Sequence, residues 1–171
     1  MKLVIGNKNY SSWSLRAWFL LKETGFDFEE HRIPLDTDTT AGEIARFSPA
    51  GQVPVLLLDD EIIWDTLAIA ETVAERWPEK QLWPADPASR SHARAISAEM
   101  HSSFVALREA MPMNCRAMRR KVTITDDVAA DIDRLFAIWT ECHRRYGEHG
   151  DWLFGDFSIA DAMFAPVVMR F

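Results

Sequence analysis

The sequence predicts an α/β domain with the element order βαβαββα, followed by an all-α domain. Three observations carry this prediction. Short apolar runs alternate with amphipathic segments over residues 1–77, a proline-rich stretch without periodicity covers 78–88, and only helical spacing follows over 89–171. We therefore expect an N-terminal domain, a linker and a helical domain. We expect the helical domain to be incomplete at its C-terminus, because its last apolar helix is still running at Phe171.

Each element of the N-terminal domain has a local signal. Compact apolar runs predict strands at Lys2–Gly6, Phe28–Ile33, Pro54–Leu58 and Glu61–Trp64. Apolar residues at three- and four-residue spacing predict helices at Ser14–Gly25, Gly42–Phe47 and 66–77. Gly25 suits the position after a helix end, Thr40 and Glu43 have the spacing of a capping box, and Asp65 suits an N-cap.

The second domain shows helical signals only. Apolar periodicity predicts helices over 88–111, where Pro112 interrupts, over 126–147, and from Ser158 onward. Ser158 and Asp161 have the spacing of a capping box at the start of the last helix. We interpret this pair as a folding element and assign it no chemistry.

Composition excludes several classes of function. The 171 residues carry a formal net charge of -7, which argues against nucleic acid or an anionic membrane surface as the main partner. No apolar stretch approaches the roughly 18–20 residues that cross a bilayer, and the N-terminus is a poor signal peptide. Cys115 and Cys142 match no zinc spacing, so we expect no metal and two free, buried thiols in a reducing cytoplasm.

Three weaker signals come from polar or proline residues beside predicted strands. A cis peptide before Pro54 is one way to fit a proline at the start of an interior strand. The helix that begins after Asp65 presents backbone N–H groups that attract a carboxylate. Ser11 and Ser12 precede the first helix and have hydroxyls that could reach a ligand. Taken singly, the serines and Asp65 are also explained as ordinary N-caps.

All three signals belong to the same end of one small sheet, which is the thioredoxin-like arrangement. The combination resembles the glutathione transferase family, and the resemblance covers essentially the whole chain. The matching stretches are "SSWSLRAWFLL", "FSPAGQVPVLLLDD", "WDTLAIAETVAE" and "FSIADAMFAPVV". Within the family, "SSWS" is most similar to the zeta class, of the bacterial, serine-type kind. Trp13 stands where that class has a cysteine, which leaves a maleylacetoacetate isomerase activity open.

The resemblance implies an enzyme that uses glutathione as co-substrate. Ser11 is expected to stabilise the thiolate as a catalytic residue, with Ser12 as the close second choice. The enzyme would activate the thiol for attack on, or isomerisation of, a small electrophile. The implied setting is detoxification in the cytoplasm, by a homodimer. The alternative is a non-catalytic binding or interaction module with the same fold; a thiol–disulfide oxidoreductase is disfavoured because the first helix starts without cysteine.

The resemblance also implies which residues bind glutathione. The backbone of Val53, positioned by Pro54, pairs with the cysteinyl part of the ligand. Asp65 binds the amine of the γ-glutamyl end and Thr66 its carboxylate. Gln52 and Arg16 are candidates for contact with the edge of the ligand, although Arg16 is also explained as a solvated or inter-domain helix residue.

Overall fold

The computed structural model describes residues 1–171, and the chain folds as two compact units. Unit 1 comprises Met1–Lys80 and unit 2 comprises Gln81–Phe171. The division falls inside the stretch 78–88 that the sequence marks as a linker. No helix of the chain is long and apolar enough to cross a membrane.

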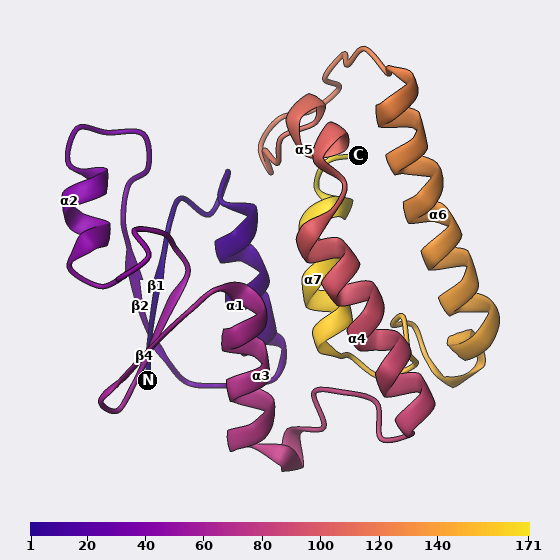
Figure 1. Cartoon of the computed structure of the whole chain (residues 1–171), viewed down its shortest axis with the longest axis horizontal. Helices are drawn as coiled ribbons and strands as arrows, with labels where there is room; N and C mark the ends of the chain where they lie inside the picture. Colours follow the sequence, from indigo (N-terminus) through magenta and orange to yellow (C-terminus); the bar gives the residue numbers. More distant parts are fainter. The chain divides into compact units, whose positions relative to one another are not determined.

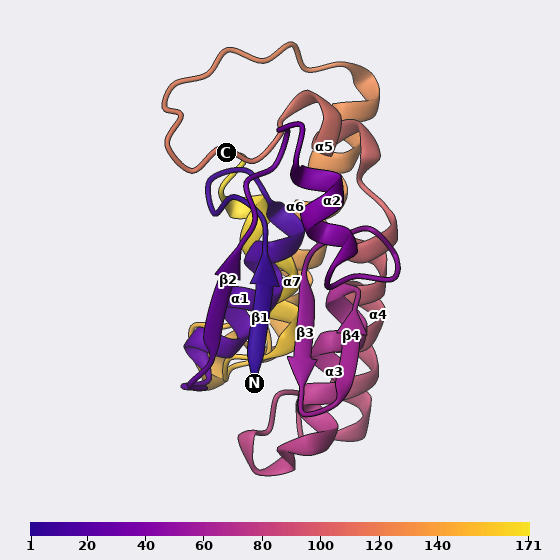
Figure 2. The same cartoon turned by 90° about the vertical axis from the view of Figure 1, so that its left-hand side faces the viewer.

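Unit 1 is built on a four-stranded mixed sheet with the order β2-β1-β3-β4 (Figure 2). The strands are β1 (Lys2–Ile5), β2 (Glu29–Arg32), β3 (Val55–Leu58) and β4 (Glu61–Trp64). β1 pairs in parallel with β2 and antiparallel with β3, and β3 pairs antiparallel with β4. The two central strands are apolar and buried, whereas the edge strands are mostly exposed. The predicted thioredoxin-like arrangement is confirmed.

Helices cover both faces of this sheet (Figure 1). They are α1 (Ser12–Glu23), α2 (Thr40–Ala45) and α3 (Thr66–Arg76), and a short 3-10 turn follows at Pro78–Lys80. α1 and α3 pack against each other on one face, where α1 buries Leu20 and Leu21. α2 lies on the other side, where Ile44 joins a cluster with Val4 and Val55. Burial of these apolar faces holds α1 and α3 against the sheet.

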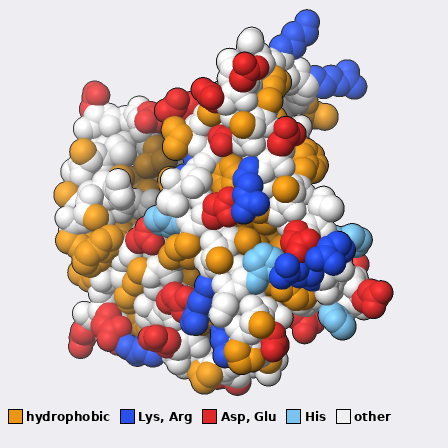
Figure 3. All heavy atoms as spheres, turned by 45° about the vertical axis from the view of Figure 1, so that its right-hand side comes forward, with side chains coloured by type: hydrophobic (Ala, Val, Ile, Leu, Met, Phe, Trp, Pro, Cys, Tyr) orange, Lys and Arg blue, Asp and Glu red, His pale blue; other side chains and the backbone are white.

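Unit 2 is all helical, as predicted. Its helices are α4 (Pro87–Ser102), α5 (Val105–Ala110), α6 (Asp126–Tyr146) and α7 (Ile159–Val168), with a 3-10 turn at Gly147–His149. α7 packs against α4, and α5 packs against α6. Almost every residue of α7 is buried, including Asp161 and the internal Pro166, so α7 is the core helix of the unit. On the face shown in Figure 3, acidic and basic side chains are interspersed among apolar ones.

One long helix predicted from the sequence is wrong. Instead of running over 88–111, the chain breaks after α4, because Ser103 is extended and Phe104 has a φ of 64°. The aromatic ring of Phe104 is buried by this break. Arg108 of α5 folds back to bond the carbonyl oxygens of Met100 and His101, which lie in the last turn of α4. A tertiary contact thus ends a helix that periodicity alone would continue.

Two smaller predictions also need correction. α2 begins at Thr40 and not at Gly42, and the Thr40 hydroxyl donates to the carbonyl oxygen of Pro34 (2.8 Å) and accepts from the Thr37 N–H (2.9 Å). It therefore holds the preceding loop and forms no capping box with Glu43. Cys115 is exposed, so only Cys142 is a buried thiol; burial raises the pKa of Cys142 to about 11.

Candidate functional site

The register of the sheet places the ends of three strands at the same end of the sheet. Val4 lies beside Val55, and Val55 lies beside Trp64. The end of β1, the start of β3 and the end of β4 therefore share one row. The turn before α1, the loop before β3 and the start of α3 leave from this edge, as the sequence predicts.

The hydroxyls of Ser11 and Ser12, at the start of α1, differ in their hydrogen bonds. Ser11 is the N-cap and accepts weakly from the Ser14 N–H (3.4 Å), while its own hydroxyl donates to Ser14 Oγ (2.8 Å). Ser14 Oγ also accepts from the Gly6 N–H at the end of β1 (3.0 Å), which ties the helix to the strand. Ser12 is half-buried and its hydroxyl makes no hydrogen bond within the protein. Ser11 is committed to the fold, and Ser12 is available to a ligand.

Trp13 and Arg16 form a pair one turn into the same helix. The Arg16 guanidinium lies 4.4 Å from the centre of the Trp13 ring, and Arg16 is only 1% exposed. The interpretation of Arg16 as a solvated residue is wrong, because almost none of its surface is exposed. Trp13, at the position where the resemblance implies a cysteine, is thus the packing partner of a buried cation.

The loop before β3 presents backbone at the same edge. The peptide bond between Val53 and Pro54 is cis. Gln52 is exposed, and its N–H donates to Ser48 Oγ (3.1 Å), which anchors the loop from the inside. Pro54 and Val55 are buried, and Val53 is half-buried and packs against the core cluster that contains Val4 and Val55. Gln52 is therefore the exposed residue of this loop segment.

α3 begins with a polar pair that the sequence also singled out. Asp65 has a φ of 72° and caps the helix, with its Oδ1 accepting from the N–H groups of Leu67 (2.9 Å) and Ala68 (3.3 Å). Thr66 is buried, and its Oγ1 has no hydrogen-bond partner. Buried hydroxyls without partners are uncommon in folded proteins. A carboxylate at this helix start would meet partial positive charge from the first backbone N–H groups.

Comparison with known proteins fits this geometry. Residues 10–76 match the model of the glutathione S-transferase N-terminal domain. A probable maleylacetoacetate isomerase from Caenorhabditis elegans is 36% identical over 86 residues, which cover 50% of this chain and 39% of that protein. Residues 10–76 are therefore similar to a glutathione S-transferase N-terminal domain. The match supports the predicted resemblance to the family, and the isomerases among the relatives agree with its zeta-like character.

Two further comparisons extend over nearly the whole chain. A crystal structure of a glutathione transferase homolog from Burkholderia gl BGR1, with bound glutathione, is 26% identical with a TM-score of 0.71. The match covers 99% of this chain and 80% of that one. A stringent starvation protein A homolog from Coxiella burnetii is 23% identical over 92% of this chain and 70% of that protein. The chain spans 39% of the length of the C. elegans isomerase, and the site residues between 11 and 66 lie within the match to the N-terminal domain model.

The helical unit contains the Ser158–Asp161 box, and the polar groups of the box are all paired within the protein. The Asp161 carboxylate accepts from the Ser158 N–H (2.8 Å), the Ser158 hydroxyl (2.9 Å) and the Leu153 N–H (2.9 Å). Burial raises the pKa of Asp161, and these hydrogen bonds oppose the rise. All of these groups are satisfied internally, so the box serves the fold.

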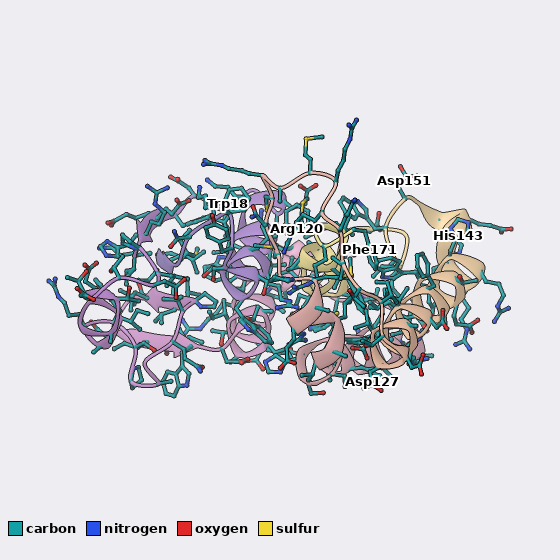
Figure 4. The ribbon with its side chains drawn as sticks, turned by 90° about the horizontal axis from the view of Figure 1, so that it is seen from above. Trp18, Arg120, Asp127, His143, Asp151 and Phe171 are labelled. Carbon is teal, nitrogen blue, oxygen red and sulfur yellow. The ribbon has the colours of Figure 1, made fainter.

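Two arginines of the helical unit, which the sequence pattern does not single out, are partly buried and bond backbone carbonyl oxygens. Arg108 bonds carbonyl oxygens at the end of α4, and Arg170 Nη1 donates to the Met111 carbonyl oxygen at the end of α5 (2.7 Å). Burial and the charge of Arg108 lower the pKa of Arg170 to about 10. Burial also lowers the pKa of Arg108. Arg120, labelled in Figure 4, adds a bond to the next carbonyl oxygen, that of Pro112 (2.9 Å).

Proposed function

We propose that this chain is a glutathione transferase that binds glutathione and activates its thiol for attack on, or isomerisation of, a small electrophile. The observation that carries the proposal is one end of the sheet at which an uncommitted serine hydroxyl, the loop containing Gln52 and Val53, and a polar helix start lie together. The family match over residues 10–76 supports it. The relatives named maleylacetoacetate isomerase favour glutathione-dependent isomerisation as one form of the reaction.

Ser12 is the thiolate donor in this proposal, and Ser11 is the cap that positions it. This reverses the preference that the resemblance alone suggested, because the Ser11 hydroxyl already donates to Ser14. A thiol with a cysteine-like pKa of about 8.5 is only about 7% ionised near pH 7.4. A hydroxyl donor and the N-terminus of α1 together would favour the anion, and a downward shift of about two units gives about 90% thiolate.

The remaining contacts hold the rest of glutathione. The backbone of Val53 pairs with the cysteinyl part, with Gln52 at the edge of the ligand. Asp65 binds the γ-glutamyl amine while its Oδ1 caps α3, and Thr66 binds the γ-glutamyl carboxylate through the helix start. Arg16 acts through the Trp13 ring against which it lies and makes no direct contact.

For the electrophile we favour a molecule that carries a carboxylate. The name maleylacetoacetate isomerase, borne by the C. elegans relative, agrees with an acidic substrate.

The assembly and its setting belong to the same proposal. β4 is an edge strand that exposes Ile62 and Trp64 on one face, with 49% and 45% of their surface accessible. An apolar edge of this kind is a natural surface for a second copy, which supports the expected homodimer. Free thiols at Cys115 and Cys142 suit a reducing cytoplasm, where a detoxifying enzyme would act.

The alternative remains a non-catalytic module of the same fold. The similarity to a stringent starvation protein A homolog, a name that states no enzymatic activity, is the observation that favours it; it covers 92% of this chain and 70% of that protein. A module of this kind needs neither the free Ser12 hydroxyl nor the polar start of α3. Glutathione binding therefore separates the two candidates.

The test is calorimetric titration of glutathione into the wild-type chain and two aspartate variants. Asp65→Ala removes a helix cap and the proposed amine contact, whereas the control Asp86→Ala removes only the cap of α4, where Asp86 accepts from the Ser89 N–H (2.8 Å). We expect D65A to weaken binding by at least about tenfold and D86A to leave it unchanged. Absence of wild-type binding at millimolar glutathione would contradict the proposed enzyme.

A further inference from the structure

A cavity lies beside α1, apart from the residues assigned to glutathione. Its volume is about 160 Å³, and its lining residues are Ile5, Lys8, Ser14, Leu15 and Trp18. Ile5 and Ser14 are almost fully buried, and Leu15 and Trp18 are half-buried. The lining is nearly all apolar, because the long stem of Lys8 contributes methylene groups. Neither Ser12, Val53, Asp65 nor Thr66 is among the lining residues.

Trp18, Lys8 and Glu30 form an interacting cluster at the outer wall of this cavity. Trp18 Nε1–H donates to Glu30 Oε2 (2.8 Å), and Lys8 Nζ lies 2.9 Å from the same oxygen. Lys8 Nζ also lies 4.7 Å from the centre of the Trp18 ring. Burial alone would raise the pKa of Glu30, but the bonds from Lys8 and Trp18 and the charges of Lys8 and Lys22 lower it. The ionised Glu30 therefore holds the Trp18 ring in one orientation at neutral pH and neutralises the charge of Lys8.

We propose that this cavity is a binding site for an uncharged ring of benzene size, distinct from the glutathione site. Its size carries the choice, because a cavity of about 150 Å³ lined by apolar side chains can hold benzene. Its chemistry selects a neutral ligand, since Glu30 already pairs with the one cation at the wall. Trp18 (labelled in Figure 4) supplies an aromatic face against which such a ring packs.

The cavity shares one wall with the start of α1. Ser14 lines it, and Ser14 Oγ accepts from both the Gly6 N–H and the Ser11 hydroxyl. A ring in the cavity therefore contacts the residue that fixes the helix cap, without replacing any group assigned to glutathione. The site does not depend on the proposed transferase activity and can be tested without turnover.

The experiment follows fluorobenzene by fluorine NMR as the full chain is added. The wild type should give saturable broadening, and Leu15→Trp, which fills the cavity, should weaken binding by at least about tenfold. The matched control Leu15→Met keeps the side-chain volume and should bind within about twofold of wild type. Benzoate should bind at least about tenfold more weakly than fluorobenzene, because its carboxylate finds no free cation at the wall.

A second variant protects the test against misfolding. If L15W does not fold, Trp18→Leu removes the aromatic wall and should weaken fluorobenzene binding by at least about fivefold. Absence of wild-type binding, or unchanged binding in a folded filling or wall variant, would overturn the proposal. Glutathione titration of the same samples reports separately on the proposed function, so failure of one assignment is distinguishable from failure of the other.

Discussion

Two helices of this protein have a serine as N-cap, Ser11 before α1 and Ser158 before α7, and the two helix starts serve different purposes. At α7, the Asp161 carboxylate accepts from Ser158 twice and from Leu153 once, and Asp161 is 7% exposed. At α1, Ser11 turns inward to Ser14 while the hydroxyl of Ser12 makes no hydrogen bond within the protein. We call the start of α7 closed, because all its polar groups are paired within the protein, and the start of α1 open, because the Ser12 hydroxyl is not. This difference, rather than the presence of serine, distinguishes a folding element from a candidate site.

The physical basis of that difference is satisfaction of buried polar groups. A closed network gains stability only if all of its members are paired. An open start leaves a donor for a partner that is not part of the chain, at a helix terminus that already favours negative charge. The comparison therefore predicts large effects on stability from α7 and small effects on stability, but large effects on chemistry, from α1.

Asp161→Ala should produce the largest change in stability. It leaves the N–H groups of Ser158 and Leu153 buried without an acceptor, which should lower the free energy of unfolding by about 3 kcal/mol. Denaturant unfolding measures this value. The control Asp133→Ala lies on the exposed side of α6 and should stay within about 0.5 kcal/mol of wild type. Equal effects of the two variants would remove the distinction between closed and open starts.

Ser14→Ala should produce the next largest loss of stability, because the Ser14 hydroxyl is the shared hydrogen-bond acceptor at the start of α1. The variant leaves the Gly6 N–H and the Ser11 hydroxyl without their shared partner, at a cost of about 2 kcal/mol in unfolding free energy. Hydrogen exchange at the Gly6 amide, followed by NMR, should become faster in the variant. Unchanged protection of that amide would show that Ser14 does not tie α1 to β1.

Ser11→Ala should cost about 1 kcal/mol, the usual value for an N-cap. Thr125→Ala offers a matched loss elsewhere, since Thr125 caps α6 by accepting from the Val128 N–H (3.4 Å). Thermal unfolding of both variants should show similar shifts. A much larger effect of S11A than of T125A would mean that Ser11 does more than cap.

The smallest effect concerns pH and the loop that leads into α7. His92 lies 3.2 Å from the Tyr146 hydroxyl and packs edge-on against Phe154, and burial with the charges of Arg145 and Arg134, opposed by that of Glu141, lowers its pKa. A lowered pKa favours neutral histidine, so its contribution is present above about pH 6.5 and is lost as the pH falls. His92→Phe should flatten the decline in stability between about pH 7 and pH 5. An unaltered slope in chemical denaturation would contradict this assignment.

Local signals predicted most of unit 1 because its elements are short and sharply bounded. The cap at Asp65 and the end of α1 before Gly25 both depend on a few neighbouring residues. Sequence also identified the sheet edge on which Ser12 and Val53 lie. It could not predict which serine caps α1, because that depends on Ser14 meeting Gly6 across the helix–strand contact.

The helical unit was harder to predict for the same reason. Periodicity continues from α4 into α5, and only the contact of Arg108 with the end of α4 shows why the helix stops. Arg108 and Arg170 come together through tertiary packing, so no local pattern announces them. The cavity behind Trp18 is equally invisible in sequence, since Glu30 of β2 holds its wall.

The most direct test of the open start is a pH titration of the thiolate absorbance of bound glutathione in wild type, Ser12→Ala and Ser11→Ala. Ser12→Ala should raise the pKa of the bound thiol by about one unit or more, because a donor to sulfur is lost. Ser11→Ala should move it by less than about 0.5 unit. A shift confined to Ser11→Ala, with the Ser12→Ala titration unchanged, would contradict the central claim that the hydroxyl left open by the fold is the one that meets the thiol.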